Sequence, residues 1–194
     1  MQVSYYREQN LSYVVIDDYL TEEEHGEVLA EAKDLKRLAA SAEITGAAED
    51  NNNNHKKTGT GVFVDPLYTN NRMASPVLCM GRKIFSSELC EVLAVFDVVF
   101  SFISKSKRDE TLINYYTPGQ EYKAHCDVWN ITAITLLGWG DFTGGGFCFP
   151  DQDVKVKFKQ GRTIVFPSCA KHCSESVEGP EGVCRVSVAH FIGN

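Results

Sequence analysis

The sequence predicts a mainly β protein with helices in its N-terminal half and strands that close into a barrel or jelly roll. Helix start signals gather before residue 95, and short apolar runs separated by Gly and Pro follow it. The chain has 194 residues, 43% hydrophobic and 23% charged, which suits one globular domain over residues 1–194. We expect residues 1–94 to supply helical support and residues 95–194 to form the β core.

The N-terminal segment opens with a strand and a helix. Residues 13–20, YVVIDDYL, are typical of a short strand that runs into a turn. Thr21 and Glu24 have the spacing of a capping box, which predicts a helix from about residue 22 to 38. One stripe of that helix is apolar and should pack on the core; it consists of Val28, Ala32, Leu35 and Ala39.

A polar stretch follows this helix. Residues 41–61 are poor in apolar side chains and rich in Asn and Gly, which is typical of a mobile loop within a domain. We define the loop as residues 44–68, because GVFVDPLY at its end predicts a strand or hairpin arm. A passive insertion without a role is the alternative. Ser75-Pro76 and Ser86-Ser87-Glu88 then indicate two further helix starts.

The second half of the chain consists of short β-type runs. Each run is bounded by turn residues, as expected for an all-β sandwich or barrel. No internal repeat is visible. The runs are VFDVVFSFI, TLINYY, EYKAHCDV, ITAITLLG, GGFCFP, VKVKFK, RTIVFP and CRVSVAHF.

Charge and composition exclude several classes of partner. A net charge of −7 and a pI near 5.2 have the wrong sign for a protein that binds phosphate backbones, so no nucleic-acid partner is expected. No membrane association is expected either, because no apolar run approaches the ~18 residues of a spanning helix. The N-terminus does not resemble a secretory signal, and seven cysteines show no disulfide framework. We therefore expect an intracellular (cytoplasmic) protein with free thiols, not a secreted one.

A metal site is the strongest chemical signal. His125 and Asp127 are two residues apart in a strand-like run, so both side chains should point to one face. His172, just past the run RTIVFP in a turn-like segment, is the best candidate for a third ligand. Two histidines and one carboxylate leave adjacent coordination positions open, which is the arrangement of Fe(II) oxygenases. These three residues are the candidate catalytic and metal-binding set.

The last strand-like run carries a candidate anion site. Arg185 and Ser187 share one face, and a guanidinium beside a hydroxyl suits a two-pronged grip on a carboxylate. By the same alternation His190 faces away from Arg185, so we discount it as a ligand. A zinc site is a weaker alternative, because paired spacing and a fourth ligand are lacking for Cys169, His172 and Cys173.

Several stretches occur in an order that matches a known family. They are NYYTPGQEYKAHCD, DFTGGGFCFP, KQGRTIVFPSCAKHCSESV and RVS. From Asn114 to Phe191 the chain resembles the prolyl 4-hydroxylase-like branch of the 2-oxoglutarate/Fe(II) dioxygenases, and YVVIDDYLTEEE resembles the opening of that branch. The resemblance implies a double-stranded β-helix (jelly roll) core, with Fe(2+), 2-oxoglutarate and O2 as cofactors and ascorbate as a reductant.

The resemblance also implies roles for single residues. His125, Asp127 and His172 match the iron ligands of the family. Arg185, with Ser187 nearby, matches the residue that pairs with the distal carboxylate of 2-oxoglutarate. Further candidates for contact with that cosubstrate are Tyr116, its neighbour Tyr115, and Thr132 and Thr135 from the next run.

Two features depart from the family pattern. Many prolyl hydroxylases carry Lys where this chain has Arg185. The separation of His172 from Arg185 is also longer than usual, because SESVEGPEGVC adds a turn.

The resemblance implies an enzyme that couples decarboxylation of 2-oxoglutarate to C–H hydroxylation, with a prolyl residue in a peptide or protein as substrate. KKTGTGVFVD resembles the loop that closes over the peptide in that branch. The alternatives are a hydroxylase of a small molecule or free amino acid, a nucleic-acid demethylase, and a non-enzymatic jelly-roll binding protein.

Overall fold

Four α-helices support one side of the molecule. The computed structural model describes residues 1–194. The predicted capping box is confirmed: the Glu24 amide donates to Thr21 Oγ1, and the Thr21 amide donates to the Glu24 carboxylate. Ser75 and Ser86 cap the next two helices, as predicted. The helices are α1 (Glu22–Leu35), α2 (Pro76–Arg82), α3 (Ser87–Phe96) and α4 (Phe102–Lys105), with 3-10 turns at Lys36–Leu38, Asp65–Tyr68, Arg72–Ala74, Lys83–Phe85, Val98–Ser101 and Pro150–Gln152.

The strands form two antiparallel sheets and a small third one. The larger sheet has the order β1-β2-β10-β6-β13-β4-β3, and the smaller has the order β5-β11-β8-β9. β7 pairs with β12 alone. The bounds are β1 Gln2–Glu8, β2 Leu11–Asp17, β3 Thr60–Phe63, β4 Arg108–Tyr116, β5 Tyr122–His125, β6 Ile131–Trp139, β7 Thr143–Gly144, β8 Phe147–Phe149, β9 Val154–Val156, β10 Thr163–Pro167, β11 His172–Ser174, β12 Val177–Glu178 and β13 Cys184–Gly193.

Eight of these strands make a jelly roll. Strands β4, β13, β6 and β10 face strands β5, β11, β8 and β9, and the chain passes repeatedly from one sheet to the other. The predicted jelly-roll class is confirmed. Strands β1 and β2 extend the larger sheet past β10, and β3 extends it past β4. Because the chain crosses between sheets, residues far apart in sequence meet inside the barrel.

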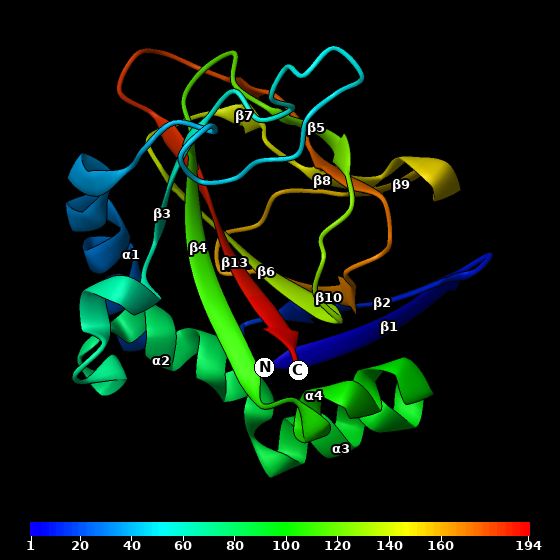
Figure 1. Ribbon diagram of the computed structural model, residues 1–194. Helices are drawn as coiled ribbons and strands as arrows, with labels where there is room; N and C mark the ends of the chain where they lie inside the picture. Colours follow the sequence, from blue (N-terminus) through cyan, green and yellow to red (C-terminus); the bar gives the residue numbers. More distant parts are fainter.

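The core has two layers (Figure 1). Helices lie along the outer face of the larger sheet, and the cluster between them includes Val28 and Leu78 with Ile113 and Val186 of the sheet. A second cluster fills the space between the two sheets and includes Phe147. Successive side chains of each central strand therefore point alternately into the helix-covered cluster and into the space between the two sheets. None of the helices has the length and hydrophobicity to span a membrane.

One predicted strand is wrong. The run from Val95 to Ile103 is helical, because Ser86 caps α3 and Asp97 accepts from the Val99 amide to begin the next turn. The apolar run predicted a buried strand, but two of its valines, Val95 and Val98, are exposed on the surface, at 84% and 78%. Four strands were not predicted: β1, the short strands β7 and β12, and β11. His172 is the first residue of β11, whereas the sequence placed it in the turn-like segment before that strand.

The expectation of free thiols also needs a correction. Cys148 of β8 and Cys173 of β11 are directly opposite residues of adjacent strands, and the structure joins them in a disulfide. The other five cysteines are free. Since Cys173 is paired, it is not available for the zinc site considered above.

Candidate active site

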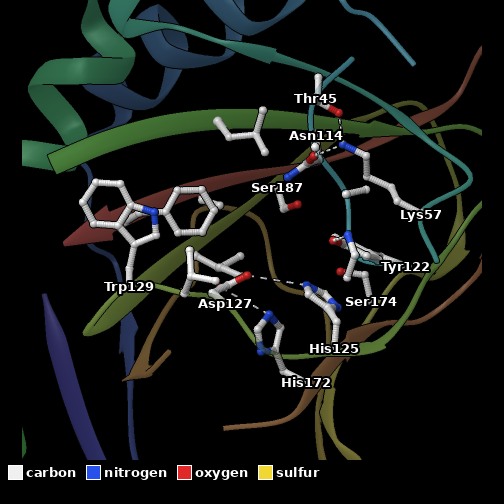
Figure 2. Close-up of a pocket in the computed structure, with 18 of the residues that line it drawn as sticks. Thr45, Lys57, Asn114, Tyr122, His125, Asp127, Trp129, His172, Ser174 and Ser187 are labelled. Carbon is white, nitrogen blue, oxygen red and sulfur yellow. Dashed lines mark hydrogen bonds and ion pairs between the residues drawn. The ribbon is translucent and has the colours of Figure 1, made fainter. Parts of the chain in front are cut away.

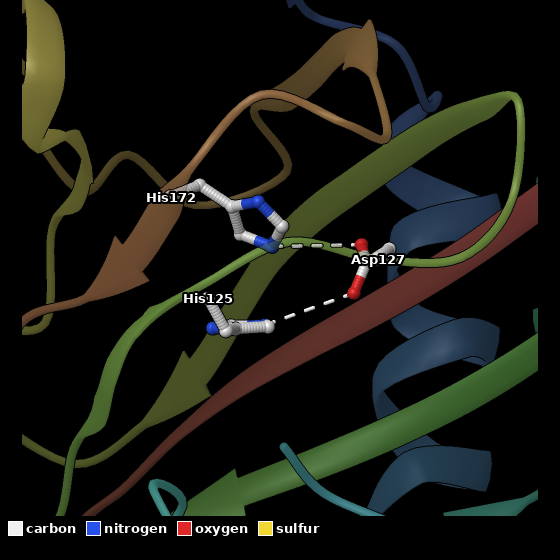
Figure 3. A group of neighbouring side chains, drawn as sticks. All are labelled: His125, Asp127 and His172. Carbon is white, nitrogen blue, oxygen red and sulfur yellow. Dashed lines mark ion pairs between the residues drawn. The ribbon is translucent and has the colours of Figure 1, made fainter. Parts of the chain in front are cut away.

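Two strands and a tight turn bring His125, Asp127 and His172 together. His125 ends β5 and His172 begins β11, and the two are directly paired across these strands. Asp127 lies just past β5, where its amide donates to the Ser168 carbonyl at 2.9 Å. One ligand atom from each side chain lies within 4.8 Å of the others, and Figure 3 shows the three converging. The predicted cluster thus forms, although Asp127 follows the strand instead of belonging to it.

The backbone sets the orientation of both imidazoles. His125 Nδ1 lies 2.9 Å from the Lys123 carbonyl, and His172 Nδ1 lies 2.9 Å from the Ala170 carbonyl. A carbonyl only accepts, so each Nδ1 carries the proton and each Nε2 presents a lone pair. The Nε2 atoms lie 3.7 and 3.5 Å from the Asp127 carboxylate oxygens. The donor set, two Nε2 lone pairs and a carboxylate, fits a divalent metal ion of the Fe(II) type.

Aromatic rings hold the histidines in place. The Tyr122 ring stacks on His125 with a centroid distance of 3.6 Å and an interplanar angle of 13°. His172 packs between Phe147 and Phe166, at 5.4 and 4.8 Å. Packing on both imidazoles limits their rotation, so the site is rigid before any ligand arrives.

Burial shifts every ionisable group of the cluster toward its neutral form. Desolvation, assisted by the neighbouring His172, lowers the pKa of His125 to about 3. Desolvation also lowers the pKa of His172 and raises the pKa of Asp127. Neutral imidazoles are the form that binds metal, and a bound cation would restore the carboxylate to its charged form.

Thr132 of β6 positions the carboxylate. Its hydroxyl donates to Asp127 Oδ2 at 2.9 Å and lies 2.8 Å from Ser168 Oγ. We expect Thr132→Val to weaken metal binding about 10- to 100-fold, because hydrogen bonds behind a ligand contribute about that much. Titration of the purified protein with Mn(II) or Fe(II) measures the change.

Thr135 provides a matched control for that substitution. It lies on the same strand but faces the helices, where its hydroxyl lies 2.8 Å from Thr163 Oγ1. Thr135→Val should leave the metal affinity unchanged. If the two valine variants bind metal alike, Thr132 does not orient Asp127. This geometry also corrects the expectation that Thr135 contacts the cosubstrate.

The cluster lies on the wall of a cavity of about 470 Å³ (Figure 2). In this view Trp129 lies at one end, and Lys57, Thr45 and Asn114 lie at the other. The apolar part of the lining includes Phe63, Leu112, Trp129, Ile134 and Phe191. Its polar part includes Thr45, Lys57, Asn114, Tyr116, Ser174 and Ser187. The cavity therefore offers apolar and polar surface beside the metal ligands.

Arg185 is fully buried next to this cavity. Its guanidinium carbon lies 5.0 Å from the centre of the Tyr116 ring, which lines the cavity. Nε donates to the Gly145 carbonyl at 3.1 Å, whereas both Nη atoms are buried without a partner. Burial lowers the pKa of this guanidinium. Two unpaired Nη groups on one buried cation fit a carboxylate, which would accept from both.

Strand alternation separates the remaining predicted contacts. Tyr116 and Ser187 line the cavity, as predicted. Tyr115 faces the helices, where its hydroxyl donates to the Ala32 carbonyl at 2.7 Å, so its proposed contact with the cosubstrate is wrong. His190 also faces outward, and its Nδ1 lies 2.9 Å from Thr111 Oγ1. This agrees with the predicted alternation, because an odd separation of five residues places His190 on the face opposite Arg185.

The extra turn between His172 and Arg185 has a structural role. It contributes β12, which pairs with β7, and the Ser176 carbonyl accepts from the Gly145 amide at 2.8 Å. Gly145 has a φ of +63°, and a Cβ atom there would lie 3.0 Å from Arg185 Cγ. The longer segment thus anchors the glycine loop whose carbonyl holds Arg185.

The polar loop lies against the cavity. Its residues 44–48 contribute to the lining. The Ala48 amide donates to Tyr122 Oη at 3.0 Å, and Thr58 and Glu121 exchange hydrogen bonds. These bonds fix the loop to β5 more than its polar composition indicated. Its mobility stays a prediction.

Sequence reasoning missed part of the lining. Alternation along β4 from Tyr116 places Asn114 and Leu112 on the cavity face, so that signal was present. Lys57 had no such signal, because its segment has no periodicity. Gly59 and Gly61 explain how that segment approaches β4 so closely: a Cβ at Gly59 would collide with the Tyr115 carbonyl.

Fold and site together define a class, the jelly-roll proteins that carry two histidines and one carboxylate as a metal cluster. Residues 111–193 match the family model described as the 2OG-Fe(II) oxygenase superfamily. This match covers most of the jelly-roll core and supports the resemblance seen in the sequence. The superfamily implies Fe(2+), 2-oxoglutarate and O2 as its reactants. A comparison with curated protein sequences finds no match.

Three solved structures show how widely this fold is shared. A Pseudomonas putida prolyl-4-hydroxylase has a TM-score of 0.68 and 15% identity, with 95% of this chain and 94% of that chain covered. A prolyl hydroxylase from Trichoplax adhaerens, in complex with a hypoxia inducible factor peptide fragment, has a TM-score of 0.61 and 14% identity, covering 93% and 83%. EctD from S. alaskensis with 2-oxoglutarate and 5-hydroxyectoine has a TM-score of 0.56 and 15% identity, covering 92% and 71%.

Proposed function

We propose that this chain is a 2-oxoglutarate-dependent Fe(II) dioxygenase that hydroxylates a C–H bond, with a prolyl residue of a peptide or protein as its substrate. The observation that carries the proposal is the buried convergence of two Nε2 atoms and one carboxylate on the wall of a cavity. His125, Asp127 and His172 would hold the iron. When bound, iron and 2-oxoglutarate supply the oxidising chemistry, in which the keto acid loses CO2 and becomes succinate.

The residues of the chain would bind and orient these reactants. Arg185 would take the distal carboxylate of 2-oxoglutarate through its two unpaired Nη groups. Tyr116, whose ring lies against that guanidinium, and Ser187 both line the cavity and would contact the same cosubstrate. Thr132 would keep Asp127 turned toward the metal. The loop at residues 44–48 would exclude water from the cavity once a substrate is bound.

A prolyl substrate is supported by shape and by analogy. The apolar lining offers Trp129, Phe191 and Leu112, a surface that suits a pyrrolidine ring. Two of the three structures compared above are prolyl hydroxylases, one of them bound to a peptide. A small molecule or free amino acid is the second candidate, and the cavity volume of about 470 Å³ suits a ligand of that size. We propose ascorbate as the reductant and an intracellular location, as the sequence predicts.

A peptide-library experiment tests the proposed function. The protein is incubated with Fe(II), 2-oxoglutarate, ascorbate and proline-containing peptides, together with free amino acids in a parallel reaction. Mass spectrometry should detect the gain of one oxygen atom in a peptide, with succinate formed in equal amount. Oxygen gained only by a free amino acid would establish the second candidate. Absence of succinate in every reaction would indicate a non-enzymatic binding protein.

A further inference from the structure

Lys57 is a buried cation without an acidic partner. The residue is 3% exposed, and its ammonium donates to Thr45 Oγ1 at 2.7 Å and to Asn114 Oδ1 at 3.0 Å. Both acceptors are neutral, and Lys57 forms no salt bridge. An ammonium carries three N–H donors, so two hydrogen bonds leave one donor free. A buried charge without a counterion is costly, which points to a function for this group.

The ammonium is placed inside the cavity of the metal cluster. Lys57, Thr45 and Asn114 all line it, and in Figure 2 they lie together with Ser187, across from His125 and His172. A Cβ at residue 61 would lie 3.2 Å from the Lys57 nitrogen, so Gly61 leaves room for the ammonium. Burial lowers the pKa of Lys57 to about 8, a cost that a bound anion would offset.

The two acidic residues of the lining do not neutralise Lys57. Asp127 faces the two histidines and accepts from Thr132. Glu110 lies four residues before Asn114 on β4, which corresponds to roughly 13 Å along a strand. The cavity therefore has a positive end that no residue of the chain satisfies.

The cosubstrate already has a different candidate partner. The two carboxylates of 2-oxoglutarate require one metal site and one cationic site, and the buried Arg185 with two unpaired Nη groups supplies the latter. Lys57 is a second, separate cation held by the loop rather than by β13. It faces the space that remains for the molecule to be oxidised.

We infer that Lys57 binds a carboxylate group of the substrate, so that the chain acts on a carboxylic acid whose apolar part lies along Trp129 and Phe191. This inference rests on the proposed function and narrows its substrate class. The carboxylate can come from a free amino acid, from the end of a peptide chain, or from an acidic side chain beside the residue that is oxidised. The test has a separate arm for each source.

Binding is measured on the full chain without turnover. The protein carries 13C-labelled lysine and Zn(II) as a redox-inert ion in the metal cluster. The side-chain NMR signal of Lys57 is assigned by its loss in Lys57→Met. The probes are pairs of an acid and its amide: L-proline and L-prolinamide, Gly-Gly-Pro with a free or amidated end, and acetyl-Asp-Pro-amide with acetyl-Asn-Pro-amide. Each is added in the presence of 2-oxoglutarate.

At least one acid should shift the Lys57 signal saturably. Its affinity should be tenfold or more above that of its amide. The pair that shows this difference identifies the source of the carboxylate. Lys56→Met is the matched control. Lys56 is the neighbouring lysine, bonds to the Ala124 carbonyl at 3.0 Å and does not line the cavity, so this variant should keep the preference. Lys57→Met should lose the preference for the acid. Because this variant has no Lys57 signal, binding to it is followed through the NMR signals of the added acid or amide.

Three results would overturn the inference. They are equal binding of every acid and its amide, a preference that survives in Lys57→Met, and saturation of the Lys57 signal by 2-oxoglutarate alone. The last result would assign Lys57 to the cosubstrate. Because the signal does not depend on catalysis, carboxylate binding without any hydroxylation would refute the proposed function while leaving the Lys57 site intact.

A thermal melt separates this role from a structural one. If Lys57 served only to join the loop to β4, Lys57→Met would lower the melting temperature of the ligand-free protein. A binding role predicts a melting temperature equal to or above that of the wild type, because methionine removes a buried charge. A clear decrease would contradict the inference.

Discussion

Asp127→Ala is expected to abolish succinate formation and to remove detectable binding of Fe(II). The substitution leaves two neutral imidazoles and no anionic ligand, so the charge that would hold a divalent ion is gone. His172→Ala should have the same effect, since it removes the ligand from β11 and leaves only the two from the β5 side. Succinate release and metal titration measure both variants.

The fold should survive these substitutions. Burial raises the pKa of Asp127, so removing this carboxylate should not lower the stability of the metal-free protein. Metal should raise the melting temperature of the wild type, because an ion that binds only the folded state stabilises it. It should leave the melting temperature of Asp127→Ala unchanged, because that variant lacks the complete metal site. His25→Ala, which changes a histidine of α1 outside the cavity, is the control and should behave as wild type. Full turnover by His172→Ala would contradict the assignment of the ligands.

Arg185→Gln should weaken the binding of 2-oxoglutarate far more than the binding of iron. Loss of one partner of a buried charged pair costs about 2–5 kcal/mol. Since about 1.4 kcal/mol corresponds to a factor of ten, the apparent dissociation constant should increase by a factor between roughly 30 and a few thousand. Calorimetric titration of the Zn(II)-loaded protein with 2-oxoglutarate measures this without catalysis.

Arg162 offers a matched control. Its guanidinium forms a two-pronged pair with Asp17, with Nε and Nη2 donating at 2.8 and 2.9 Å, and neither residue lines the cavity. Arg162→Gln should lower the thermal stability and leave the affinity for 2-oxoglutarate unchanged. If Arg185→Gln binds 2-oxoglutarate as tightly as the wild type, another residue holds the distal carboxylate. Lys57, the other cation at the cavity, would then be the candidate for that role.

Local patterns predicted those residues whose position depends on strand alternation. Alternation placed Arg185 and Ser187 on one face of β13 and His190 on the other, and the structure agrees. It could not decide between Tyr115 and Tyr116, because the register of β4 against β13 is a tertiary property. The jelly-roll class was predicted from the short apolar runs of the second half of the chain. The run that begins at the exposed Val95 was misassigned, because some of its apolar side chains lie on the surface of a helical segment.

The features that sequence reasoning missed all depend on long-range contacts. Lys57 lies in a segment without periodicity, and only the fold shows that its ammonium meets Asn114, 57 residues away. The pairing of Cys148 with Cys173 depends in the same way on the register of β8 and β11. The unusual length before Arg185 was visible as an insertion, but its contact with Gly145 was not.

The absorption spectrum of the Fe(II)-loaded protein, recorded without oxygen before and after addition of 2-oxoglutarate, tests the central claim most directly. If His125, Asp127 and His172 hold iron with adjacent positions open, the keto acid should chelate the metal and produce a new visible charge-transfer band. The band should be absent in His172→Ala and should require far more 2-oxoglutarate in Arg185→Gln. A wild-type protein that binds Fe(II) at this cluster but shows no spectral change with 2-oxoglutarate would contradict the account.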